Sequence, residues 1–129
     1  MRKNRRDDST ILLVEDDELN RKLLHQLLQS RGYRVIEAVN GLVALELAKR
    51  ERPALILMDI DLPGLDGIGI TRRIREDAAL RQTPIFMVTA FDTPEIRAAA
   101  FDAGCDEYLV KPLDADRLET LLKSVLREK

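Results

Sequence analysis

Continuous apolar runs alternate with amphipathic segments along most of the 129-residue chain. Three runs, at residues 11–14, 55–58 and 85–88, are apolar throughout, which is typical of strands that helices cover on both faces. Two more strand-like runs begin near Tyr33 and Tyr108, and the run from Tyr33 carries two charges, which suits an edge strand. This alternation predicts βα units wound into a parallel sheet.

The segments between the strands have the period and the end signals of helices. The first runs from about Leu19 to Gly32, with Asp17 as a solvated cap and one apolar face, formed by Leu19, Leu23, Leu24, Leu27 and Leu28. His25 lies off that face and is expected to point to solvent. Residues suited to cap the next three helices are Asn40, Asp66 and Thr93, the last followed by Pro94, and Gly104 suits the end of the fourth helix. The fifth helix is expected to begin near Asp114.

The charged strand gives the sheet order. With that second strand at one edge and right-handed crossovers, the chain predicts an α/β fold with a doubly wound, five-stranded parallel sheet of order 2-1-3-4-5 and helices on both faces. The topological switch point, where such sheets place their chemistry, then lies between the first and third strands.

The composition of the chain limits the classes of protein to which it can belong. Hydrophobic content of 45% and charged content of 34% suit one globular domain, expected at residues 10–127, after a flexible basic tail at 1–9 and before a C-terminal end at 128–129. A net charge of -2 gives no case for direct nucleic-acid binding, and no run is long enough for membrane insertion. The single cysteine, Cys105, suits a reducing cytoplasm, so we expect a cytoplasmic protein.

Polar residues follow four of the predicted strands: the pair Glu15 and Asp16, then Asp59, Thr89 and Lys111. Because the carboxyl ends of parallel strands lie at one edge of the sheet, these side chains are expected to share a pocket. Converging carboxylates repel one another, and Mg²⁺ is the natural counter-charge. Thr89 and Lys111 are suited to bind phosphoryl oxygens, and a carboxylate near Mg²⁺ can attack phosphorus. The pattern therefore favours phosphoryl transfer onto Asp59.

The same residues carry a family resemblance. In order along the chain they are Glu15-Asp16, then Asp59 with Pro63 and Asp66-Gly67, then Thr89-Ala90, then Lys111-Pro112. From about Thr10 to Arg127 the chain resembles the receiver domain of two-component response regulators, a flavodoxin-like (βα)5 fold, and looks like the stand-alone, chemotaxis-regulator type.

The resemblance implies roles for these residues. Asp59 would accept a phosphoryl group from a phosphohistidine on a histidine kinase or a histidine phosphotransfer protein. Asp16 and Asp59 would bind Mg²⁺ directly, Asp61 through its backbone carbonyl and Glu15 through water. Thr89 and Lys111 would hold the phosphoryl group.

The resemblance also implies a switch. Tyr108 holds the position of an aromatic residue that swings inward when Thr89 moves toward the phosphate, and Lys111-Pro112 would be a cis peptide. The fourth helix, fifth strand and fifth helix would then bind a downstream effector protein, or a second copy in a dimer linked to phosphorylation. Such a domain is not an enzyme, apart from its own phosphorylation and dephosphorylation.

Two positions vary in this family and tune the lifetime of the aspartyl phosphate. Here they are Asp61 and Phe91. The bulk of Phe91 favours slow hydrolysis, whereas an acid at position 61 can act in either direction. We expect a phosphate lifetime longer than minutes.

Two alternatives stay open at this point. Asp59-x-Asp61 after an apolar strand also resembles the nucleophile motif of haloacid-dehalogenase-type phosphohydrolases, although that family has Thr or Val where this chain has Pro63. The second alternative is an adaptor with the receiver fold that works by contact alone, without phosphorylation. Whether the domain stands alone or belongs to a larger regulator is also open.

Overall fold

A computed structural model describes residues 10–62, 64 and 66–126. The predicted tail at 1–9, the C-terminal end at 128–129, and the motif residue Pro63 lie outside the described residues.

Five parallel strands form one sheet in the order β2-β1-β3-β4-β5. They are β1 (Thr10–Val14), β2 (Arg34–Ala38), β3 (Leu55–Asp59), β4 (Ile85–Thr89) and β5 (Glu107–Val110). The predicted fold class and strand order are confirmed, with β2 at one edge.

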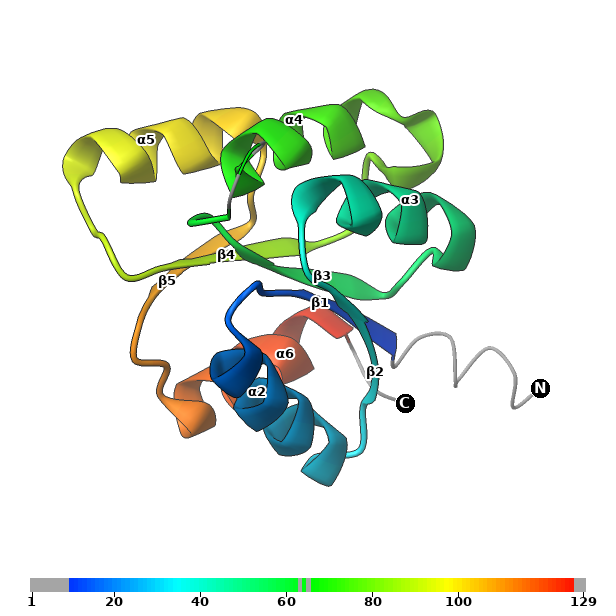
Figure 1. Ribbon diagram of the computed structural model, residues 1–129, viewed down its shortest axis with the longest axis vertical. Coiled ribbons are helices and arrows are strands. Elements are labelled where there is room, and N and C mark those ends of the chain that lie inside the picture. The colour runs from blue at the N-terminus through cyan, green and yellow to red at the C-terminus, as the bar shows by residue number, and fades with distance from the viewer. Residues whose placement is uncertain (1–9, 63, 65, 127–129) are drawn as a thin grey trace.

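Helices cover both faces of this sheet. They are α2 (Glu18–Ser30), α3 (Gly41–Glu51), α4 (Gly67–Glu76), α5 (Pro94–Ala103) and α6 (Ala115–Leu126). Figure 1 shows α3, α4 and α5 on one side of the sheet and α2 and α6 on the other. A short 3₁₀ helix, η1 (Ala78–Leu80), leads into β4 and has no counterpart among the predicted elements.

The strands form because their side chains fill two cores. Strands β1, β3 and β4 are buried along their whole length. Alternate residues point to opposite faces, so Leu12, Ile56 and Met87 pack under α3, α4 and α5, while Ile11 and Phe86 pack over α2 and α6. Strand β2 has two exposed residues, Arg34 and Glu37, as its edge position allows.

The predicted helix caps are all present among the described residues. The side chains of Asp17, Asn40, Asp66 and Thr93 each accept a hydrogen bond from a backbone amide three residues later, at 2.9, 2.9, 2.9 and 3.1 Å. Asp114 does the same at the start of α6, and Gly104 ends α5 with a φ of 116°. Local sequence therefore fixes where these helices begin and end.

The predicted apolar face of α2 is only partly buried. Leu28 is buried and Leu24 and Leu27 pack beside the core, but Leu19 and Leu23 are 64% and 55% exposed. A helix that lies against one face of a sheet buries only the residues directly above the strands, so the wide leucine stripe extends beyond the contact.

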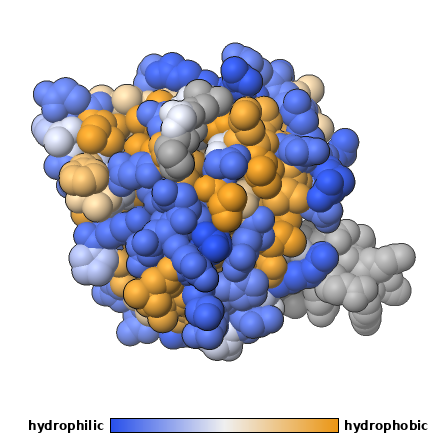
Figure 2. All heavy atoms as spheres, viewed as in Figure 1, coloured by the Kyte–Doolittle hydropathy of each residue, from blue (hydrophilic) through white to orange (hydrophobic). Residues whose placement is uncertain are grey.

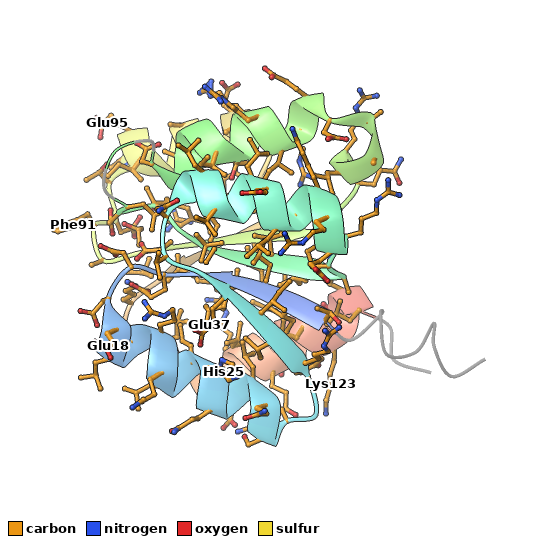
Figure 3. All side chains as sticks on the ribbon, turned by 45° about the vertical axis from the view of Figure 1, so that its right-hand side comes forward. Glu18, His25, Glu37, Phe91, Glu95 and Lys123 are labelled. Carbon is orange, nitrogen blue, oxygen red and sulfur yellow. The ribbon has the colours of Figure 1, made fainter. Side chains whose placement is uncertain are left out.

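His25 also differs from the prediction. Its ring is only 29% exposed, and its Nδ1 lies 2.6 Å from a carboxylate oxygen of Glu37 on β2. Figure 3 shows the two side chains pointing toward each other across the gap between α2 and β2. Glu37 also pairs with Arg21 on α2, so His25 and Arg21 share one carboxylate partner on β2.

Helix α4 packs unusually close to the end of β3. A Cβ atom on Gly67 would lie 2.5 Å from the backbone oxygen of Asp59 and 2.9 Å from the Cα of Ile60. The Gly67 amide donates a hydrogen bond to the Ile60 carbonyl at 3.2 Å. Glycine at this position lets the first turn of α4 fix the backbone around Asp59.

At the other end of α4, Arg75 joins several segments. Its guanidinium donates to the backbone carbonyls of Leu80, Arg81, Thr83 and Gly104 and pairs with the carboxylate of Asp106. The Asp106 carboxylate in turn accepts from the backbone amide of Ile85 at 2.8 Å. We call this group the Arg75 clamp. It lies at the edge of the sheet where β4 and β5 begin.

On the face drawn in Figure 2, hydrophilic residues predominate and apolar residues form separate patches. Among the described residues, no helix is both long and apolar enough to cross a membrane. Cys105 is buried, and burial, together with the nearby charge of Asp106, raises the pKa of its thiol to about 11.

Candidate functional site

The carboxyl ends of β1, β3, β4 and β5 bring the predicted polar residues together. Val14 of β1 pairs in register with Met58 of β3, one residue before Asp59, and Thr89 of β4 pairs with Val110 of β5, one residue before Lys111. The residues that end or follow these strands therefore meet at one edge of the sheet. We call this edge the acidic rim.

Asp59 lies at the centre of the acidic rim and is only 4% exposed. One carboxylate oxygen accepts a hydrogen bond from the Asp61 amide at 2.9 Å, and the other accepts from Lys111 Nζ at 3.2 Å. The two donors fix the orientation of a buried carboxylate on a rigid strand.

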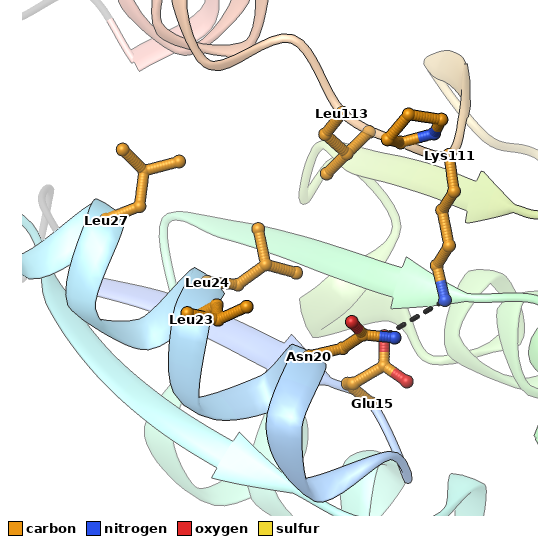
Figure 4. Close-up of a pocket in the computed structure, with 8 residues that line it drawn as sticks. Glu15, Asn20, Leu23, Leu24, Leu27, Lys111 and Leu113 are labelled. Carbon is orange, nitrogen blue, oxygen red and sulfur yellow. Dashed lines mark hydrogen bonds and ion pairs between the residues drawn. The ribbon is translucent and has the colours of Figure 1, made fainter.

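Lys111 supplies the positive charge at the rim. Its Nζ lies 3.2 Å from Glu15 Oε1 as well as 3.2 Å from Asp59 Oδ2. Figure 4 shows the lysine reaching across to Glu15. Burial acts to lower the pKa of Lys111, but its attraction to Asp59 and Glu15 outweighs burial, and the pKa is raised. The lysine is therefore firmly charged. Its peptide bond to Pro112 is cis, the geometry that the family resemblance implies.

The pKa of Glu15 is raised by burial and by the neighbouring acid Asp59. Burial, a hydrogen bond with Asp59 and the charge of Asp59 raise the pKa of Glu15 from 4.5 to about 7. A hydrogen bond from the Asp17 amide and the charge of Lys111 oppose this rise without cancelling it. The rim therefore holds more negative charge than Lys111 neutralises, and a second cation would relieve it.

The acids are close enough to share that cation. One oxygen from each of Glu15, Asp16 and Asp59 lies within 4.8 Å of the others, and Asp16 is exposed to solvent. Ligands of a single Mg²⁺ are at most about 4.2 Å apart, since its bonds to oxygen are about 2.1 Å long. The spacing fits an all-oxygen Mg²⁺ site with a small side-chain rotation, or with one acid binding through water.

One contact at the rim was not predicted from the sequence. The Thr89 hydroxyl donates to the carboxylate oxygens of Asp61 at 3.1 and 3.3 Å, and the Ala90 amide donates to the same carboxylate at 3.3 Å. From the sequence, the Asp61 backbone carbonyl was expected to be a metal ligand and the Asp61 side chain to influence phosphate lifetime, but no contact with Thr89 was predicted. The sequence signal that could have indicated this contact is the position of Asp61, an acid two residues after Asp59 at the end of a strand.

Tyr108 of β5 is buried, with 5% of its surface exposed. The guanidinium of Arg97 on α5 lies 4.6 Å from the centre of its ring, and Phe101 packs at a centroid distance of 6.3 Å. Its hydroxyl has no hydrogen-bond partner among the described residues, and burial followed by the charge of Asp92 raises its pKa. The ring thus occupies an inward position beneath α5.

Phe91 has the opposite character. Its backbone amide donates to the Thr89 hydroxyl oxygen at 3.0 Å, but its side chain is 63% exposed. In Figure 3 the ring projects away from the molecule beside the rim.

An apolar groove opens next to the rim, between α2 and the segment after β5. Figure 4 shows Leu23, Leu24 and Leu27 of α2 facing Leu113, with Glu15 and Lys111 at one end. The exposed Leu23, on the predicted apolar face of this helix, lines the groove.

Comparison with known proteins agrees with this geometry. Residues 11–123 match the family described as the response regulator receiver domain. Among curated proteins, the chain is 41% identical to the polar-differentiation response regulator DivK of Brucella anthropi, over 91% of this chain and 95% of that protein.

Solved structures give the same result. The receiver domain of a sensor histidine kinase from Pseudomonas aeruginosa, with a magnesium ion coordinated in its active-site cleft, is 38% identical, with a TM-score of 0.87 over 92% of this chain and 98% of that one. The chemotaxis protein CheY4 of Vibrio cholerae is 30% identical, with a TM-score of 0.85 over 91% and 98% of the two chains. These matches favour the receiver family over the haloacid-dehalogenase-type phosphohydrolases, whose nucleophile motif Asp59-x-Asp61 also resembles. The chain belongs to the response regulator receiver family of two-component signalling.

Proposed function

We propose that Asp59 accepts a phosphoryl group from a phosphohistidine of a histidine kinase or a histidine phosphotransfer protein. The observation that carries the proposal is the placement of Asp59: a buried carboxylate, held by the Asp61 amide and Lys111, beside two further acids. Family membership supports the phosphoacceptor role, and the identity of the donor is our inference.

The phosphoryl group passes directly from the donor nitrogen to Asp59. A carboxylate oxygen of Asp59 forms a bond to phosphorus as the bond between phosphorus and the donor's imidazole nitrogen breaks. The bonding electron pair stays on that nitrogen, and the product is an acyl phosphate. Lys111 pairs with the negative charge that the phosphoryl oxygens bring, and Thr89 donates its hydroxyl to one of them.

We propose Mg²⁺ as the cation of the rim, with Asp16 and Asp59 as direct ligands, the Asp61 backbone carbonyl as a third, and Glu15 acting through water. When bound, Mg²⁺ would neutralise the acids and polarise the phosphoryl oxygens. The spread of the carboxylate oxygens and the raised pKa of Glu15 support this assignment.

We further propose that phosphorylation acts on the surface formed by α5, β5 and α6. Thr89 ends β4, directly before the loop that leads to α5, and Tyr108 packs under α5 through Arg97. A hydroxyl drawn toward a phosphoryl group would shift this loop and the packing around Tyr108. A downstream effector, or a second phosphorylated copy, would then recognise the altered surface.

The donor protein needs a surface beside the rim. The groove between α2 and Leu113 ends at Glu15 and Lys111, so a partner helix seated there would lie next to Asp59. Exposed Leu19 and Leu23 supply apolar contact area for such a partner.

The test of the proposed function is direct modification. The protein is incubated with Mg²⁺ and acetyl phosphate, and the modified peptide is identified by mass. We expect one added phosphoryl group on Asp59, which does not form when EDTA is present during the incubation and is absent in Asp59→Asn. Repeated turnover of p-nitrophenyl phosphate would instead favour a phosphohydrolase, and a partner that binds wild type and Asp59→Asn equally would favour a contact-only adaptor.

A further inference from the structure

The side chain of Asp61 occupies hydrogen-bond donors that face the acidic rim. Its carboxylate accepts from the Thr89 hydroxyl at 3.1 Å and from the Ala90 amide at 3.3 Å. A hydroxyl has a single proton to donate, and the other acceptor near it, the Phe91 carbonyl, is farther away at 3.4 Å. The Thr89 proton is therefore directed at Asp61.

The backbone of the same residue places this carboxylate beside the reactive one. The Asp61 amide donates to Asp59 at 2.9 Å, while its side chain reaches the end of β4. Asp61 thus bridges Asp59 and Thr89, which lie on neighbouring strands. An anion attached to Asp59 that bonded to the Thr89 hydroxyl or the Ala90 amide would take a donor that the Asp61 carboxylate already occupies.

A phosphoryl group and the Asp61 carboxylate exclude each other at these donors. Phosphorylation adds about -1.5 to -2 charges and three acceptor oxygens, which repel a carboxylate held at the same hydroxyl and amide. Asp61 is exposed, so its side chain can rotate into water once it is displaced.

We propose that the Asp61 carboxylate is an internal competitor of the phosphoryl group: it holds the Thr89 hydroxyl and the Ala90 amide until an anion on Asp59 displaces it. This inference rests on the proposed function and adds a specificity-determining side chain to it. Asp61 weakens the acceptance of small phosphoryl donors and keeps Thr89 engaged before phosphorylation.

The experiment measures anion binding and does not depend on turnover. Beryllofluoride, a stable analogue of a phosphoryl group, is titrated with Mg²⁺ into wild type and Asp61→Ala, followed by the NMR signal of the Ala90 amide. We expect Asp61→Ala to bind about tenfold more tightly, equivalent to about 1.4 kcal/mol. The Ala90 amide signal of Asp61→Ala should also shift before any ligand is added.

Two controls separate the hydrogen bonds from general charge. Asp17→Asn removes one negative charge next to Asp16 and keeps a good helix cap, so its affinity should change less than about twofold. In a Thr89→Val background, Asp61→Ala should gain less than about threefold, because the shared donor is gone.

The outcomes are distinct. Equal binding by wild type and Asp61→Ala, or an equal gain in Asp17→Asn, would overturn the inference and leave the proposed function intact. If neither wild type nor any variant binds beryllofluoride or is phosphorylated at Asp59, the proposed function fails and the inference fails with it.

Discussion

Glu15 is a buried acid whose ionisation works against the folded state. Its pKa rises from 4.5 to about 7 on folding, so the folded protein binds more protons than the unfolded chain between these values. This group therefore lowers the free energy of unfolding as pH rises from 4.5 to 7, and its effect is constant outside that window.

We expect metal-free protein to lose roughly 3 kcal/mol of stability through this window, which Glu15→Gln should largely restore above pH 7. Urea denaturation in EDTA at pH 5 and pH 8 measures the difference. Glu18→Gln, an exposed acid on α2, is the matched control. A wild-type curve as flat as that of Glu15→Gln would contradict the prediction.

Phe91 stands at the rim with its ring exposed and its amide on the Thr89 hydroxyl. We expect the aspartyl phosphate of the wild type to last longer than minutes. The ring projects outward in this structure, so we expect it to turn over the phosphoryl group once that group is attached and to exclude water there, and Phe91→Ala should then shorten the lifetime several-fold. Intact mass measured over time after donor removal gives both lifetimes. Leu42→Ala, which removes a comparably exposed apolar side chain on α3, should leave the lifetime unchanged. Decay of the wild type within seconds would refute this expectation.

At the scale of elements, the Arg75 clamp ties the end of α4 to η1, to the end of α5 and to the start of β5. Removing the guanidinium leaves several backbone carbonyls and Asp106 without their shared donor. We expect Arg75→Ala to lower the free energy of unfolding by about 2–4 kcal/mol.

Arg75→Lys should restore little of this stability, since one ammonium cannot reach all of these acceptors. Arg73→Ala, an exposed arginine on the same helix, should stay within about 0.5 kcal/mol of wild type. Urea denaturation compares the variants. Equal losses for Arg75→Ala and Arg73→Ala would show that the clamp does not stabilise the fold.

Elements were predictable from sequence where the deciding signals are local. Caps such as Asn40 and Thr93 act on amides three residues away, and continuous apolar runs mark strands that are covered on both faces. The leucine face of α2 did not show which of its residues are buried. The exposure of Leu19 and Leu23 depends on how far the helix overlaps the sheet, and the sequence of the helix does not specify that overlap.

At the scale of the whole molecule, the acidic rim was predictable because strand order alone brings strand ends together. The Asp61 carboxylate on Thr89 and the Arg75 clamp were not, since each depends on the side-chain direction of one residue relative to a distant loop. The sequence pattern thus predicts which strand ends lie together, but it does not predict the individual contacts between their side chains.

The molecule-wide prediction concerns the response to an anion at Asp59. With Mg²⁺ and beryllofluoride, we expect amide NMR shifts to extend from the rim into α5, β5 and the start of α6, and to be smaller in β2. The path runs through Thr89 and the packing of Tyr108 under Arg97. Asp59→Asn should show none of these shifts. Changes confined to the rim would argue against α5, β5 and α6 as the output surface.

Helix α4 begins at Gly67, next to the backbone of Asp59, and near its other end Arg75 binds the Gly104 carbonyl. Its ten residues form a rigid helix about 15 Å long between the acidic rim and the Arg75 clamp. We expect a ligand that displaced the Arg75 end of α4 to move the backbone at Asp59 as well, because one rigid helix joins the two contacts. Such a ligand would lower phosphorylation without competing with the phosphoryl donor for the acidic rim.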